Sequence, residues 1–195
     1  VPLLEDDPYG ELRFEGEAAP PLAAVPGMSA QTVLLNSASK VMAPGVRIGW
    51  LRAEGPILRA LEIAKQAVGL QSAVTDQLAV ARYLATCDLD AHIAHVVEVY
   101  RERRDAMADG LVRRLPRGAT VTRPEGGMFL WVALGDGTDT AASLPAAVDA
   151  GVAYVPGWSF FASDPDRSTM RLSFVTNAPG VIEDGLDRLA CALDW

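Results

Sequence analysis

The sequence predicts an α/β protein in two parts, and three observations support this. Short apolar runs of strand length alternate with longer segments of helical periodicity, which is the order typical of α/β layers. Half of the 195 residues are hydrophobic, enough to bury a sizeable core. One long amphipathic helix interrupts the alternation and gives a natural boundary, so we expect one part over 1–88 and a second over 89–195.

The first part is predicted to hold three strands and two helices. In order, the expected elements are strands over 1–5, 32–35 and 47–51, a helix starting at Pro56, and a helix over 74–85. The proline- and alanine-rich stretch 17–27 indicates an extended surface connection, and a loop is expected over 36–46. The sequence does not begin with Met, and its first strand would need a neighbouring strand on each side. We therefore expect further sequence upstream.

The second part begins with the clearest element of the sequence. Apolar residues recur at three- and four-residue steps from Leu89 to Leu115, with one polar gap at Arg103 or Arg104. Charged residues fill the other side, which we expect to face water, and Pro116 with Gly118 ends the helix. The expected elements that follow are strands over 119–122 and 128–134, a helix over 141–150, strands over 152–155 and 169–174, and a final helix carrying Ile182 to Leu193.

Charge and cysteine content exclude several classes of function. Lysine and arginine number 17 against 25 acids, a formal net charge of −8 that disfavours nucleic acid and anionic membranes as partners. The sequence contains no apolar run of transmembrane length. Cys87 and Cys191 form no CxxC pair, which favours a reducing compartment. We therefore expect a cytoplasmic protein with no membrane and no nucleic acid among its partners.

Four donor side chains gather in the loop after the second predicted strand. Ser37, Ser39, Lys40 and Arg47 lie within eleven residues of one another. Serine hydroxyls and an arginine fork are good donors to phosphate oxygens, and a lysine beside a phosphate-bearing aldehyde can form a Schiff base. The alternative is an ordinary solvated loop, because a Ser-x-Ser-Lys tetrapeptide is common.

A second polar group follows the first predicted strand. Asp6 and Tyr9 lie three residues apart at its carboxyl end, where ligands sit in mostly parallel sheets. An aspartate there could pair with a protonated ring nitrogen and a tyrosine with a phenolate oxygen, and pyridoxal 5'-phosphate (PLP) has both groups. Alternatively, the acidic run only makes a polar turn, and Asp7 is a rival to Asp6.

Taken together, these motifs resemble a known family. The strings Glu5-Asp6-Asp7-Pro8-Tyr9-Gly10, Ser39-Lys40-Val41-Met42-Ala43-Pro44-Gly45-Val46-Arg47 and Arg123-Pro124-Glu125-Gly126-Gly127-Met128-Phe129 stand in the order found in fold-type-I PLP aminotransferases of class I/II. They look like the 2-aminoadipate and aromatic aminotransferase branch. The resemblance implies the C-terminal half of the aspartate aminotransferase-like fold, comprising the end of the large mostly parallel-sheet domain and the small α/β domain.

The resemblance also implies a role for each residue. Lys40 would form the Schiff base with PLP and then move a proton, while Asp6 would keep the pyridine nitrogen protonated. Tyr9 would bond the ring oxygen of PLP. The phosphate would be held by Ser37, Ser39 and Arg47.

On the substrate side, Arg171 matches the arginine that binds the α-carboxylate. The alternative is an arginine that merely ends an edge strand. Gly126 and Gly127 would let the backbone approach the substrate, although such pairs more often make turns. Trp158 and Phe160 would line the pocket. His92 and His95 lack further ligands at metal spacing and are expected to be surface or packing residues.

Three functions compete at this point. The leading hypothesis is a homodimeric aminotransferase that moves an amino group between an amino acid and a 2-oxo acid. The second is the effector-sensing domain of a MocR-type transcription regulator, which uses the same fold, although Pro8 between the acidic pair and Tyr9 favours the enzyme. The third is an inactive truncated remnant, because the family's N-terminal half supplies part of the pocket.

Overall fold

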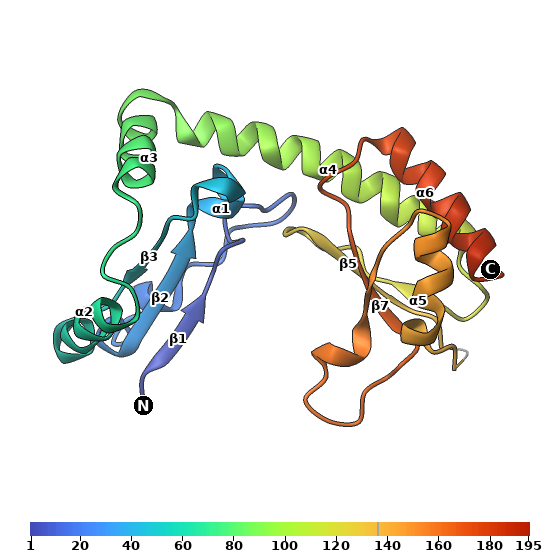
Figure 1. Cartoon of the computed structure of the whole chain (residues 1–195), viewed down its shortest axis with the longest axis horizontal. Helices are drawn as coiled ribbons and strands as arrows, with labels where there is room; N and C mark the ends of the chain where they lie inside the picture. Colours follow the sequence, from blue (N-terminus) through green and yellow to red (C-terminus); the bar gives the residue numbers. More distant parts are fainter. Residues whose placement is uncertain (136) are drawn as a thin grey trace. The chain divides into compact units, whose positions relative to one another are not determined.

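The structure is a computed structural model that describes residues 1–135 and 137–195. The chain forms two compact units, Val1–Val97 and Glu98–Trp195, and each is described by itself (Figure 1). The division falls inside helix α4, Leu89–Arg114, the long helix that the sequence predicts. The division of the chain into two domains at residue 88 stays a prediction.

The first unit contains a three-stranded mixed sheet. Its strands are β1 (Leu3–Asp6), β2 (Thr32–Ser37) and β3 (Gly49–Arg52), in the order β1-β2-β3. β1 runs parallel to β2, and β3 runs antiparallel to β2. Because β1 and β2 are parallel, their carboxyl ends, with Asp6 and Ser37, lie at the same edge of the sheet.

Helices α2 (Gly55–Val68) and α3 (Val74–Thr86) follow the sheet in the chain. The connection between β1 and β2 holds two short 3-10 turns, η1 (Leu22–Ala24) and η2 (Ser29–Gln31), where the sequence predicts an extended segment over 17–27. Among the described residues β1 pairs only with β2, so the expected second neighbour is not seen, and Leu4 is 73% exposed.

The loop predicted over 36–46 is more ordered than expected. β2 continues to Ser37, and a short helix α1 (Ala38–Val41) and a turn η3 (Pro44–Val46) follow. The Ser37 hydroxyl accepts a hydrogen bond from the backbone N–H of Ser39 at 3.1 Å, which caps α1. The next strand was predicted to begin at Arg47, but it begins at Gly49, because Arg47 has a left-handed backbone with φ 49°.

The second unit contains a four-stranded antiparallel sheet. Its order is β4 (Thr120–Val121), β5 (Phe129–Ala133), β7 (Thr169–Ser173) and β6 (Val155–Pro156). The remaining elements are helix α5 (Thr140–Asp149), the turn η4 (Gly157–Phe160) and helix α6 (Pro179–Ala192). The strand predicted over 152–155 is shorter and later than expected, because only Val155 and Pro156 pair with β7.

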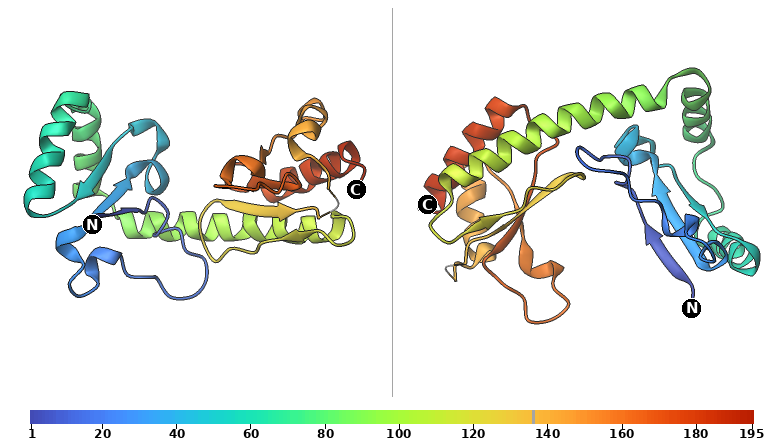
Figure 2. Two further views of the ribbon diagram at one scale, coloured as in Figure 1. Left: turned by 90° about the horizontal axis from the view of Figure 1, so that it is seen from below. Right: turned by 180° about the vertical axis from the view of Figure 1, so that it is seen from behind.

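The two faces of this sheet have different partners. Leu130, Val132, Met170 and Leu172 are buried, and Leu172 lines one small cavity together with residues of α4 and α6. Both views in Figure 2 show α4 and α6 side by side. Since side chains alternate along a strand, Phe129, Trp131 and Arg171 point to the opposite face of the sheet.

The charges of α4 do not all face water, which corrects the sequence-based expectation. Arg104 is 0% exposed, and its Nη1 donates to the carbonyl oxygen of Pro124 at 2.5 Å. Its Nε lies 2.7 Å from Asp105 Oδ1, an ion-pair contact that lacks hydrogen-bond geometry. The polar gap in the apolar stripe is therefore a buried arginine that ties the helix to the 123–127 loop.

Two observations concern membranes and metals. Within the described ranges, no helix is both long and apolar enough to cross a bilayer. His92 packs edge-on against the Tyr83 ring at 6.3 Å, and the described residues contain no cluster of three potential metal ligands.

Candidate active site

The first group of predicted site residues lies at the carboxyl edge of the β1–β2 pair. Asp6 ends β1, Tyr9 follows in the next turn, and Lys40 sits on α1 immediately beyond β2. The Lys40 ammonium lies 5.9 Å from the centre of the Tyr9 ring. The topology thus brings residues from two separate motifs to one place.

The two neighbouring aspartates are in different environments. Asp7 Oδ1 accepts a hydrogen bond from the Gly10 N–H at 2.7 Å, which closes the turn. A Cβ at Gly10 would lie 2.4 Å from Asp7 Oδ2, so a larger residue there would displace the Asp7 carboxylate from this turn. The Asp6 carboxylate is exposed and has no hydrogen bond or ion pair with a described residue. Asp6 is therefore the aspartate whose carboxylate oxygens remain available to accept a hydrogen bond from a ligand.

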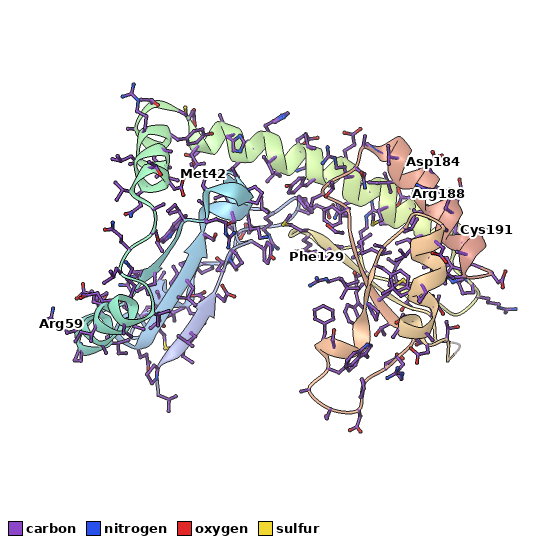
Figure 3. All side chains as sticks on the ribbon, in the orientation of Figure 1. Met42, Arg59, Phe129, Asp184, Arg188 and Cys191 are labelled. Carbon is purple, nitrogen blue, oxygen red and sulfur yellow. The ribbon has the colours of Figure 1, made fainter. Side chains whose placement is uncertain are left out.

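Helix α1 positions Lys40. Ala38 and Val41 are buried, whereas Lys40 between them is only half-buried. The neighbouring Met42, labelled in Figure 3, lines an apolar pocket of about 250 Å³ together with Val80 and other residues of α3. Lys40 has no hydrogen bond or ion pair to another described residue, so its amine is held in place by the helix rather than by a counter-ion.

Ser39 and Arg47 form a small cluster of donors. Arg47 Nη1 lies 3.3 Å from Ser39 Oγ and 3.3 Å from the carbonyl oxygen of Pro44. The backbone of Arg47 is left-handed, and this conformation at a non-glycine residue is unfavourable by about 1–2 kcal/mol. Other contacts in the fold must offset this cost to keep Arg47 in place. Ser37 is adjacent, but its hydroxyl already caps α1 and lies 3.4 Å from the Ile48 carbonyl oxygen.

Arg171 belongs to the second unit and lies in the middle of β7. It pairs with Trp131 on one side and Val155 on the other, so it does not end an edge strand. Its guanidinium carbon lies 4.1 Å from the centre of the Phe129 ring and 4.6 Å from that of Phe160. Nε is buried without a hydrogen-bond partner, and no described acid pairs with this arginine.

The sequence matches the family model described as aminotransferase class I and II over residues 1–189. The chain belongs to this family. The predicted family resemblance is therefore confirmed, and so is the predicted fold: the structure of the α-aminoadipate aminotransferase LysN from Thermus thermophilus, complexed with N-(5'-phosphopyridoxyl)-L-leucine, superposes with a TM-score of 0.93 at 34% identity.

Two curated relatives illustrate the range of the family. Aromatic-amino-acid aminotransferase 1 of Thermococcus litoralis is 45% identical over 188 residues, which cover 96% of this chain and 45% of the relative. An uncharacterized helix-turn-helix transcriptional regulator of Bacillus subtilis, YisV, is 30% identical over 97% of this chain and 39% of its own length. The LysN match covers all of this chain and 50% of LysN. The aminotransferase-family chain thus spans about half the length of the proteins it matches.

The described geometry of this aminotransferase-family chain brings together some predicted residues and not others. The Lys40 ammonium lies over the Tyr9 ring, and the Arg47 guanidinium lies within hydrogen-bond distance of the Ser39 hydroxyl. Asp6 shares their sheet edge without contacting them through a hydrogen bond or ion pair. Arg171 lies in the other unit. Gly127 has φ 82°, so this position needs glycine, while Gly126 has no positive φ.

Sequence reasoning missed the surroundings of Arg171. It assigned no role to Phe129 and gave Phe160 only a general position in the pocket wall, yet both rings pack on the guanidinium. It also missed Gly157, where a Cβ would lie 2.1 Å from Thr169 Oγ1 and 2.8 Å from the Trp131 ring. No local signal identifies these contacts, because they depend on which strands pair.

Proposed function

We propose that this chain is the lysine-bearing half of a PLP-dependent aminotransferase, which transfers an amino group between an amino acid and a 2-oxo acid. The observation that carries the proposal is the cluster at the β1–β2 edge, where Lys40, Tyr9, Asp6, Ser39 and Arg47 offer unlike groups within one short stretch of structure. Family membership supports the same reaction.

The chemistry of these donors fits PLP group by group. PLP carries an aldehyde, a pyridine nitrogen, a phenolic oxygen and a phosphate. Lys40 offers an amine, Asp6 an unspent carboxylate and Tyr9 a phenol. Ser39 and Arg47 offer a hydroxyl and a guanidinium within 3.3 Å of each other, a pair suited to phosphate oxygens.

Each residue then has a distinct task. Bound PLP supplies an aldehyde that condenses with amines and a ring that withdraws electrons. Lys40 Nζ would hold the cofactor through its aldehyde and, once the amino group of the substrate has displaced it, would take the proton from the α-carbon of the amino acid. The Asp6 carboxylate would keep a proton on the pyridine nitrogen, and Tyr9 would donate to the phenolic oxygen. Ser39, Arg47 and, in a supporting position, Ser37 would hold the phosphate.

Arg171 binds the α-carboxylate of the substrate. It is an arginine with no acidic partner among the described residues, so its donors are available to an external carboxylate. Because Nε is buried, a carboxylate must approach the terminal Nη groups. A two-point contact there fixes the substrate's α-carbon for proton removal.

A PLP titration tests the cofactor assignment. The chain should develop the visible absorbance band of a lysine-bound aldehyde, and Asp6→Asn should weaken PLP binding roughly 10- to 100-fold, the cost of losing a charge-assisted hydrogen bond. Asp7→Asn is the matched control, since an asparagine oxygen can still accept from Gly10. Equal loss in the two variants would refute the role of Asp6. No band in the wild-type chain would leave two choices: the other half of the enzyme is required for PLP binding, or the chain is an inactive remnant.

The effector-sensing domain of a regulator is the second candidate function, favoured by the similarity to YisV. Pro8 between the acidic pair and Tyr9 argues for the enzyme. The two differ in turnover: an enzyme converts bound PLP to the amine form when an amino acid is added and returns it with a 2-oxo acid. We place the protein in the cytoplasm, on its two free cysteines and acidic composition.

We also propose that the protein is a homodimer. Exposed apolar side chains gather where α2 ends and α3 begins: Val68 is 92% exposed, Leu70 82% and Leu78 64%. A run of this kind is typical of an association surface. Sedimentation should give twice the mass of one chain, and Val68→Ser with Leu70→Ser should shift the protein toward monomer. Val112→Ser, at another exposed valine, is the control and should leave the dimer intact.

A further inference from the structure

We propose that Phe160 is a positioning residue for Arg171: its ring holds the guanidinium in a carboxylate-binding orientation without consuming the hydrogen-bond donors. This inference deepens the proposed function and rests on the role of Arg171 given there. It starts from the observation that Arg171 is held by rings rather than by an acid. Phe129, labelled in Figure 3, lies on β5 next to β7, the strand of Arg171, whereas Phe160 comes from the separate turn η4.

The physical advantage of a ring over an acid is specific to a binding arginine. An aspartate or glutamate would also fix the guanidinium, but it would occupy the same N–H groups and compete with the substrate's carboxylate. A ring attracts the cation through its π face and leaves the in-plane N–H groups unpaired. Arg171 satisfies this condition, because no described residue accepts a hydrogen bond from it.

The segment that carries Phe160 is itself fixed against the sheet. Phe160 packs edge-on against Trp131 with ring centres 5.7 Å apart. Three residues earlier, Gly157 is buried so closely against Thr169 and Trp131 that any larger residue would displace the turn. The Phe160 ring, although partly exposed, is therefore held against the sheet, and the orientation of Arg171 is set before a ligand arrives. A side chain ordered in advance loses less conformational entropy on binding.

The neighbouring Phe161 provides a matched control. Its ring lies 6.2 Å from Trp131, and it is 40% exposed against 48% for Phe160. Of these two neighbouring rings, Phe160 and not Phe161 lies over the Arg171 guanidinium. Phe160→Leu and Phe161→Leu therefore remove similar apolar surface from the same segment, but only the first removes the ring from the arginine.

The test follows the Arg171 side chain by NMR in the full chain labelled with ¹⁵N-arginine, with the Nε–Hε signal assigned by its loss in Arg171→Lys. Without ligand, Phe160→Leu should move this signal toward the position of unstacked arginines, and Phe161→Leu should leave it in place. Pyruvate is the carboxylate probe, and pyruvamide, which lacks the charge, is its control. Phe160→Leu should weaken pyruvate binding on the order of 3- to 10-fold, and Phe160→Tyr should restore it.

The outcomes separate this inference from the proposed function. If pyruvate leaves the wild-type Arg171 signal unchanged, the carboxylate-binding role of Arg171 is wrong, and the inference falls with it. If pyruvate binds through Arg171 with equal affinity in Phe160→Leu and wild type, the carboxylate role stands and the positioning role of Phe160 is overturned. Equal weakening in Phe160→Leu and Phe161→Leu would also overturn it, since both would then act only through packing.

Discussion

Replacing Lys40 with alanine should abolish covalent attachment of PLP to this protein. After incubation with PLP and reduction by borohydride, the wild-type chain should carry one pyridoxyl group on the peptide that contains Lys40. Mass spectrometry of the digest locates it. The physical reason is that the Lys40 amine lies at the sheet edge without a hydrogen bond or ion pair to another described residue, so it is accessible to the aldehyde of PLP.

The sequence makes this experiment unusually clean. Lys40 and Lys65 are the only two lysines in the chain, so the possible sites of labelling are few. The Lys65 ammonium donates to the carbonyl oxygen of Leu70 at 2.7 Å and lies on helix α2, none of whose residues is buried. Lys65→Ala should be labelled like the wild type. If Lys65 in the Lys40→Ala variant carried as much pyridoxyl label as Lys40 carries in the wild-type chain, the reaction would be indiscriminate. Lys40 would then not have its proposed role.

Replacing Arg104 with alanine should cause the largest loss of stability among the charged residues of α4. The substitution removes the donor of the Pro124 carbonyl oxygen, withdraws a cation from Asp105 and leaves a cavity. Losing one member of a buried polar network usually costs several kcal/mol, and we expect about 2–4 kcal/mol here. The measurement is the urea midpoint of unfolding followed by circular dichroism.

Arg101 on the same helix provides the comparison. It pairs with Glu98 at 2.5 Å on the surface, and such pairs contribute about 0–1 kcal/mol. Arg101→Ala should therefore shift the midpoint far less than Arg104→Ala. Arg104→Met keeps most of the apolar stem and should recover the packing part of the loss but not the hydrogen bond. If the alanine variants at the two positions unfolded at the same urea concentration, Arg104 would have no special part in the fold.

Arg104 also shows where reasoning from sequence stopped. The apolar stripe of α4 predicted the helix correctly, and the gap in the stripe was visible at Arg103 or Arg104. A periodic pattern cannot reveal that the gap is filled by a buried cation, because the acceptor, Pro124, comes from a loop twenty residues away in the chain. The partner of a buried charge is a tertiary fact.

The loop after β2 illustrates the opposite case. The residue types Ser37, Ser39, Lys40 and Arg47 suggested a phosphate and aldehyde site, but an ordinary solvated loop remained the alternative until the other motifs and the family resemblance were added. The roles of these residues stay a prediction. The helix that presents Lys40 was not predicted, since four residues are too few for a periodic signal. The left-handed backbone of Arg47 was not predicted either, because such a conformation at a non-glycine residue has no local signature.

The sequence by itself determined the α/β class, most helices and strands and the family, and it supplied the residues that we propose to bind PLP. Each of these depends on local pattern: apolar periodicity, or motifs whose order along the chain is preserved. Only the tertiary structure decided which aspartate is unspent, which face of β7 carries Arg171, and that Phe129 and Phe160 are the rings that hold it. These depend on strand pairing and on contacts between distant segments, and the free energy of such contacts is set by packing that no local stretch of sequence encodes.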